Sequence, residues 1–378
     1  LGSRLGDPFD FNIKGSTSAV GISIDLDTDQ VTTITAFFPG QHLQILTSAA
    51  EFFFPTEPIV APPAVKQATR RGVQPGTQQA EMDGATVFVT RGGQAVAEFL
   101  YDDSRQNYRA DHLSYLASHL VTDIVDMAFR SALSTTDTDR ALLTRASGEI
   151  TAMSALRAQE VTGFQRWTTD GRFLAGCSDL VGETHVAVAR ELEDGEEILL
   201  ERVDEDAMLD SEVAVTVTGD PVTTIACPHL NGLTVTLYAD GGDLGDHEVV
   251  DGEVALPAAA LRKVAVGRLF QPRFVSLPLV FNQDPRAGSA MGVRTGEIGF
   301  RLGATAGLRA GIAGGRMWPV SLKRRPQVVT DAGPGEDAFA DWPRLFGVPG
   351  FRHDGQIEFV QARPGPLEVQ EIVVTVQA

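Results

Sequence analysis

A strand–turn–strand pattern recurs along the first half of the chain and most constrains its fold. Each copy has an apolar strand, a turn of small or polar residues, and a returning apolar strand; the copies are 43–54, 87–99, 142–153 and 185–202. They begin roughly 45 to 55 residues apart, a spacing typical of propeller blades. The pattern predicts an all-β chain with a β-propeller-like body. An irregular β-sandwich with repeated hairpins is the alternative.

Two further strands are expected between the third and fourth copies. They span 161–166 and 173–177 on either side of Thr169-Asp170-Gly171. Because Asp-Gly suits a tight turn, we interpret these strands as another hairpin. Together with the preceding copy they would supply four strands, the number in one blade.

Residues 223–267 describe a small β module. Thr234, Thr236 and Tyr238 alternate with apolar residues, the period of two expected of a half-buried strand. Asp251-Gly252 separates the stretches 248–250 and 253–256 and predicts a hairpin turn. We expect a propeller-like body at 1–205, an inserted small β-barrel or sandwich domain at 206–270, and a return to the body at 271–378. The acidic run 191–212 is expected to be a solvated connector.

One amphipathic helix is predicted at about 110–128. Its apolar residues recur at spacings of three and four: Leu113, Leu116, Leu120, Ile124 and Met127. Asp111 near its start would suit the helix dipole. In the last part of the chain, strands are expected at 296–302, 357–361 and 367–376, with a loop around 326–343.

The composition is that of a globular, turn-rich protein with 43% hydrophobic residues, 38 Gly and 20 Pro. The net charge of −19 argues against a general nucleic-acid binder, since phosphate binding requires clustered Lys and Arg. No apolar run is long enough for a membrane span and no signal peptide opens the sequence. Leu1 predicts a processed product or a missing first part. Cys177 and Cys227 are expected to be buried and reduced, with a disulfide between them as the alternative.

The candidate catalytic and ligand-binding motifs do not have the residue spacing that their chemistry requires. Asp25, Asp27 and Asp29 resemble a calcium loop, but Gln30 and Ala36 replace its required Gly and Glu. The other motifs considered are Gly303/Gly307/Gly311, His112 with His119, Gly288–Gly292, and the basic points Arg70-Arg71 and Lys323–Arg325. None has the pattern of a membrane-packing helix, metal site, nucleophile elbow or extended basic footprint. The sequence therefore predicts a non-enzymatic protein with no catalytic, cofactor-binding or metal-binding residues.

Several short motifs carry a family resemblance through their order along the chain. They are Asp102-Asp103, Glu160–Arg166, His229–Val235, Tyr238–Gly241, Val249–Leu256, Val264–Gly267, Val293–Arg301, Gly350–Gly355, Ile357–Phe359 and Arg363–Val373. In these motifs, across most of its length, the chain resembles the tail-nozzle or stabilization (tail tubular B-like) proteins of short-tailed bacteriophages. It departs from them at Asn231, where they have an acidic residue, and before Asp7-Pro8-Phe9, where they have a longer segment.

This resemblance implies a virion structural protein of the tail, assembled in the host cytoplasm. It implies a homo-oligomeric ring, a hexamer, below portal and adaptor proteins, which forms the distal channel for DNA ejection and holds tail fibres. An acidic channel wall would repel the DNA backbone. Two alternatives stay open: a β-propeller enzyme or lectin acting on carbohydrate, and a neck or baseplate component of a long-tailed phage.

Overall fold

The computed structural model describes residues 1–378 except 16–18, 60–62, 135–136, 160, 194, 279–292, 321, 323–342, 347–350, 353–354 and 378. It divides into two compact units, Leu1–Arg190 with Glu196–Val203, and Glu191–Gly195 with Asp204–Ala378. In both units the regular secondary structure of the described residues is almost entirely antiparallel strands. The helical elements of the described residues are three 3-10 turns, η1 (Tyr115–Ala117), η2 (Arg157–Gln159) and η3 (Pro228–Leu230). The prediction of an all-β chain is confirmed.

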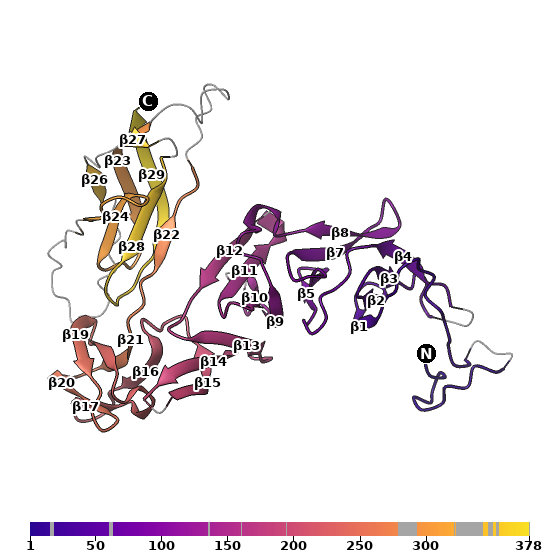
Figure 1. The fold of residues 1–378 in the computed structure, drawn as a ribbon, viewed down its shortest axis with the longest axis horizontal. Helices are drawn as coiled ribbons and strands as arrows, with labels where there is room; N and C mark the ends of the chain where they lie inside the picture. Colours follow the sequence, from indigo (N-terminus) through magenta and orange to yellow (C-terminus); the bar gives the residue numbers. More distant parts are fainter. Residues whose placement is uncertain are drawn as a thin grey trace. The chain divides into compact units, whose positions relative to one another are not determined.

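The first unit contains four consecutive antiparallel meanders (Figure 1). The first sheet is β1 (Ile34–Pro39), β2 (Leu43–Thr47), β3 (Glu51–Phe53) and β4 (Lys66–Thr69), and the second is β5 (Ala80–Met82), β6 (Ala85–Val89), β7 (Val96–Asp102) and β8 (Asn107–His112). The third is β9 (Ile124–Arg130), β10 (Asp139–Arg145), β11 (Ile150–Leu156) and β12 (Val161–Trp167), and the fourth is β13 (Arg172–Ser178), β14 (Thr184–Leu192) and β15 (Gly195–Val203). The four predicted hairpin copies correspond to β2–β3, β6–β7, β10–β11 and β14–β15, and each pair is adjacent in its sheet.

Neighbouring sheets of this unit pack face to face. Phe88 on β6 contributes to a core shared with the first sheet, whereas Val87 and Val89 on the same strand belong to a core shared with the third. Leu143 on β10 likewise joins the second and third sheets, and Leu142 joins the third and fourth. The central strands are therefore buried on both faces, and they read in sequence as continuous apolar runs rather than as alternations.

The amphipathic helix predicted at 110–128 is wrong. The segment contains the end of β8, the short turn η1 and the start of β9. Ile124 and Met127 are buried in the core between the second and third sheets, but Leu116 is 91% exposed. The apolar residues thus lie on different elements, and Asp123 has a φ of 51° that no α-helix accommodates. Packing between sheets overrides the local periodicity here.

Two other expectations for this unit also need correction. The strands at 161–167 and 172–178 do not form a hairpin, because β12 pairs with β11 and β13 pairs with β14. The Asp170-Gly171 turn between them instead joins the third sheet to the fourth. The acidic run 191–212 is not simply a connector, since it includes β15.

The sheets of the first unit follow one another along the chain as separate antiparallel meanders. Within the described residues no sheet closes on itself into a barrel. A closed propeller ring therefore stays a prediction.

The second unit begins with the small β module. One sheet has the order β16 (Asp210–Thr216), β21 (Lys263–Arg268), β18 (Thr234–Ala239) and β19 (Gly242–Glu248), and β17 (Val222–Ala226) pairs separately with β20 (Glu253–Ala260). Val235 and Leu237 are buried in its core, as predicted, but Thr236 between them is buried as well, so burial does not alternate along the strand. Asp251 and Gly252 have positive φ angles, as predicted for the turn. The flanking strands nevertheless pair with different partners and meet through one bridge, between Val250 and Glu253.

Two further sheets complete the second unit (Figure 1). One is β22 (Arg273–Val275), β28 (Ile357–Gln361), β24 (Leu308–Ile312) and β25 (Trp318–Pro319); the other is β26 (Arg344–Phe346), β23 (Val293–Leu302), β27 (Phe351–Arg352) and β29 (Val369–Gln377). Phe300 and Phe359 meet edge-on in the core that the two sheets share. The strands predicted at 296–302, 357–361 and 367–376 are confirmed as parts of β23, β28 and β29. The loop expected at 326–343 lies almost entirely outside the described residues.

Candidate functional site

The motifs singled out in the sequence do not converge in the structure. Among the described residues, no group of three or more His, Cys, Asp and Glu side chains could hold a metal ion. Asp29 of the calcium-like series forms an ion pair with Arg70 at 3.2 Å. Arg71 is exposed, and its amide N–H donates to the buried Glu51 carboxylate. Gly288–Gly292 and Lys323–Arg325 lie outside the described residues.

His112 and His119 do not share a helix face. His112 ends β8, whereas His119 lies in the turn that precedes β9. Burial, followed by the nearby Arg71 charge, lowers the pKa of His112. Gly311 lies on β24, where an added Cβ would meet the Arg316 carbonyl oxygen at 2.4 Å. A close approach to backbone is thus present at Gly311 but not in the rest of the series, since a Cβ on Gly303 would meet the Glu368 side chain and one on Gly307 would meet nothing within 4 Å.

The two cysteines differ in environment. Both are free, but Cys177 is exposed on β13 and Cys227 is buried in the small β module. The expectation that both are buried is therefore wrong for Cys177, which lies on the outer face of the fourth sheet. Burial raises the pKa of the Cys227 thiol.

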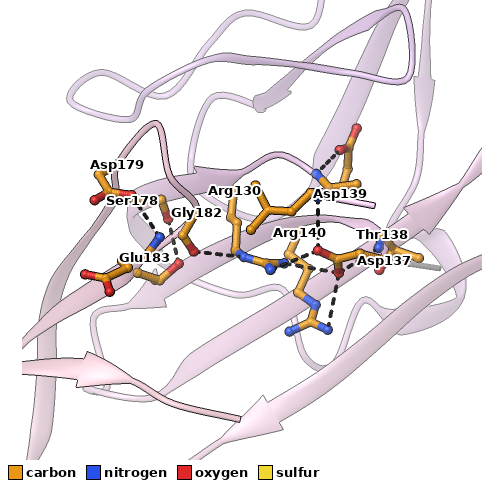
Figure 2. Close-up of polar contacts among 12 residues, drawn as sticks. Arg130, Asp137, Thr138, Asp139, Arg140, Ser178, Asp179, Gly182 and Glu183 are labelled. Atoms are coloured by element: carbon orange, nitrogen blue, oxygen red, sulfur yellow. Dashed lines mark hydrogen bonds and ion pairs between the residues drawn. The ribbon is translucent and has the colours of Figure 1, made fainter. Parts of the chain in front are cut away.

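A candidate docking site emerges from two loops of the first unit that are distant in sequence. One loop connects β9 to β10 and contains Leu133 and Asp137; the other connects β13 to β14 at 179–183. Arg130, at the end of β9, joins them. Its Nε donates to the Gly182 carbonyl oxygen at 3.0 Å, and its Nη2 lies 2.9 Å from the Asp137 carboxylate (Figure 2).

Asp137 organises its own loop around this contact. Its carboxylate accepts the amide N–H group of Leu133 at 3.2 Å. It also accepts the amide N–H group of Thr138 at 2.9 Å, and Arg140 approaches it at 3.8 Å (Figure 2). The hydrogen bond from Arg130 is the main cause that lowers the pKa of Asp137 to about 2. This carboxylate is therefore ionised at neutral pH and binds the backbone amides of Leu133 and Thr138 together with the Arg130 guanidinium.

The second loop is fixed from within. Asp179 accepts the amide N–H groups of Val181 at 3.0 Å and Glu183 at 2.8 Å. Gly182 has a φ of 85°, and an added Cβ would lie 2.5 Å from the Leu133 side chain. Leu133 thus packs closely over the glycine backbone, and the two loops form one surface.

That surface presents apolar side chains to solvent. Leu133 is 58% exposed, Val181 69% and Leu180 fully exposed. Loop tips are usually polar, and exposed apolar groups on a rigid support are typical of protein contact sites. We call these three residues the apolar tip. Leu180-Val181 within a turn was the sequence signal for it, but nothing in the sequence indicated that Leu133 lies beside them.

An arginine also joins two parts of the second unit. Arg363, between β28 and β29, donates to Asp243 at 2.6 and 2.8 Å and to Asp246 at 2.9 Å, both on β19. The hydrogen bond from Arg363 is the main cause of the lowered pKa of Asp243, while that of Asp246 is lowered first by Thr236 and then by Arg363. Two carboxylates on one guanidinium thus link the small β module to the segment between β28 and β29.

Comparison with known proteins identifies no relative from which a function could be inferred. No model of a known protein family matches the chain, and no curated protein matches it. Across the described part of the chain, no helix has the length and apolar character needed to cross a membrane.

Proposed function

We propose that this chain is a non-enzymatic bacteriophage tail component, a nozzle-like protein that assembles into a ring around the distal DNA channel. The observation that carries the proposal is the order of the first unit: consecutive antiparallel meanders, each packed face to face on the next. Propeller blades are built and packed in this manner. The family resemblance in the sequence motifs supplies the virion role and the six-fold ring.

The apolar tip supports a role in assembly. Leu133, Leu180 and Val181 are held by ion pairs and hydrogen bonds on two sheets, so little conformational entropy would be lost on binding. In a tail, this surface would contact a neighbouring protein such as an adaptor or fibre. The net charge of −19 suits a channel wall that DNA passes without adhering.

Negative-stain microscopy of the purified chain, combined with its mass in solution, tests the proposal. We expect hollow rings with a mass near six chains. A Leu180→Asp variant should form the same rings, since the apolar tip is assigned to neighbouring proteins and not to the ring contact. A monodisperse monomer that binds glycans would contradict the proposal and favour a carbohydrate-binding propeller.

A further inference from the structure

The fourth sheet of the first unit ends in a strand with an unusual exposed row. Along β15 the exposed side chains of Glu196, Ile198, Leu200 and Arg202 lie on one face. The other face carries Glu197, which is also exposed, and the half-buried Leu199, Glu201 and Val203. Ile198 is 68% exposed and Leu200 is 74% exposed. On the opposite face Glu201 binds the fully buried Arg190, and Val203 packs in the core shared with the third sheet. The exposed row is therefore a regular feature of the strand rather than a local irregularity.

β15 is also the last strand of its sheet. Its neighbour in the described sheet order β13-β14-β15 is β14, which leaves its other edge without a paired strand there (Figure 1). Edges of this kind are normally protected by charges, Pro or bulges, because their backbone groups can pair with another chain. In β15 the charges stand at the two ends of the exposed row, and the centre is apolar.

The order of this row makes it complementary to a reversed copy of itself. Along the strand the row consists of an acidic residue, two apolar residues and a basic residue. When two copies of the strand run antiparallel with Leu199 at the centre, Glu196 lies opposite Arg202 and Ile198 lies opposite Leu200. Opposite charges and apolar pairs directly across two strands are the favourable cross-strand combinations. Each charged end already includes a partner, Arg172 with Glu196 at 2.8 Å and Glu183 with Arg202 at 3.4 Å. Two acids and two bases would thus gather at each end.

We propose that β15 pairs antiparallel with β15 of a second copy of this chain, in a register centred on Leu199. The two three-stranded sheets then form one six-stranded sheet across a two-fold axis. On the core-directed face this register brings Glu197 opposite the second copy's Glu201. That contact is tolerated because Arg190 of the same chain neutralises Glu201 through two hydrogen bonds, one of 2.7 Å.

This contact goes beyond the proposed tail function and does not depend on it. A two-fold contact uses the same surface on both copies and closes with two chains, whereas a cyclic ring needs two different surfaces. A dimer without rings would therefore support this inference while contradicting the ring. Rings that are unaffected by changes in β15 would do the reverse.

Charge exchange tests the register. Sedimentation of the native chain over a concentration series should show pairwise association, either of two single chains or, where rings form, of two rings. Glu196→Arg should weaken this association roughly tenfold through two equivalent like-charge contacts. The double variant Glu196→Arg/Arg202→Glu should restore the dimer, although it leaves like charges beside Arg172 and Glu183 within each chain. Failure of the double variant to restore association, or a native chain that stays monomeric at all concentrations, would overturn the proposal.

Disulfide trapping gives a second measurement on the same register. In a Cys177→Ser background, Leu199→Cys should cross-link two chains rapidly under mild oxidation, because the two introduced thiols face each other at the axis. Glu197→Cys is the matched control, since its counterpart across the axis is Glu201. Circular dichroism verifies that each variant is folded. Equal cross-linking of both variants, or cross-linking of the control alone, would refute the register.

Discussion

Replacing Asp137 by Asn should loosen the two loops that carry the apolar tip. Arg130 and other donors lower the pKa of this carboxyl from 3.8 to about 2, a difference of roughly 2.4 kcal/mol at 1.36 kcal/mol per pKa unit. The paired side chains are 17% and 15% exposed, so solvent screening reduces the contribution to about 1–2 kcal/mol. The substitution removes the charge but keeps the shape of the side chain.

Hydrogen exchange measures this change where it occurs. The Leu133 amide donates to the Asp137 carboxylate, so its exchange reports opening of the loop. At neutral pH we expect Asp137→Asn to raise the exchange rate of this segment about 5- to 30-fold, as 1–2 kcal/mol implies. Asp103→Asn is the control because Asp103 is exposed in the turn after β7.

The pH dependence has a defined sign. A carboxyl with a lowered folded-state pKa stabilises the folded state fully above its ordinary pKa of 3.8 and loses this effect as the pH falls toward 2. The difference in loop opening between native protein and Asp137→Asn should therefore shrink between pH 4 and pH 2. Equal exchange in Asp137→Asn and the control at neutral pH would refute the reasoning, as would a difference that grows in acid.

Three further outcomes are expected. Phe88→Ala should reduce the free energy of unfolding of the first unit by about 3–5 kcal/mol in urea titrations, because the side chain is fully buried between two sheets; a loss below 1 kcal/mol would contradict face-to-face packing. Cys177 should react with a thiol reagent in the folded protein, and Cys227 only after unfolding, with mass spectrometry locating the label. Arg363→Ala should cost roughly 1 kcal/mol at neutral pH, with the cost disappearing in acid as its two lowered-pKa carboxylates become protonated; thermal unfolding over pH tests this sign.

The sequence correctly predicted those structural elements that are determined by residues close together in the chain. The β6–β7 and β10–β11 hairpins are confirmed because their strands, their turns and their pairing all lie within short segments. The prediction of a β12–β13 hairpin was wrong because each of these strands pairs within a different sheet, β12 with β11 and β13 with β14. The helix at 110–128 failed for a related reason: Ile124 and Met127 at helical spacing belong to a β-strand buried between two sheets.

The candidate site was beyond the reach of local patterns. Leu180 and Val181 are conspicuous as apolar residues in a turn, but their support comes from Arg130 and Asp137 in an earlier part of the chain. Only the pairing of β13 beside β14, packed on the third sheet, brings the two loops together. Ion pairs that form through such packing cannot be recognised from the spacing of residues in the sequence.

The burial of the central strands on both faces affects the order in which the sheets of the first unit unfold. Because β6 and β10 each contribute to two cores, each inner sheet is stabilised by both neighbours, as in repeat proteins with nearest-neighbour coupling. Among the described residues the fourth sheet shares a core with the third sheet through one face, whereas the outer face of the first is covered by Leu26 and other residues around Phe52. Unfolding should thus begin at β13–β15 and propagate toward the first sheet, so that brief protease treatment cuts the chain between Arg172 and Val203 first.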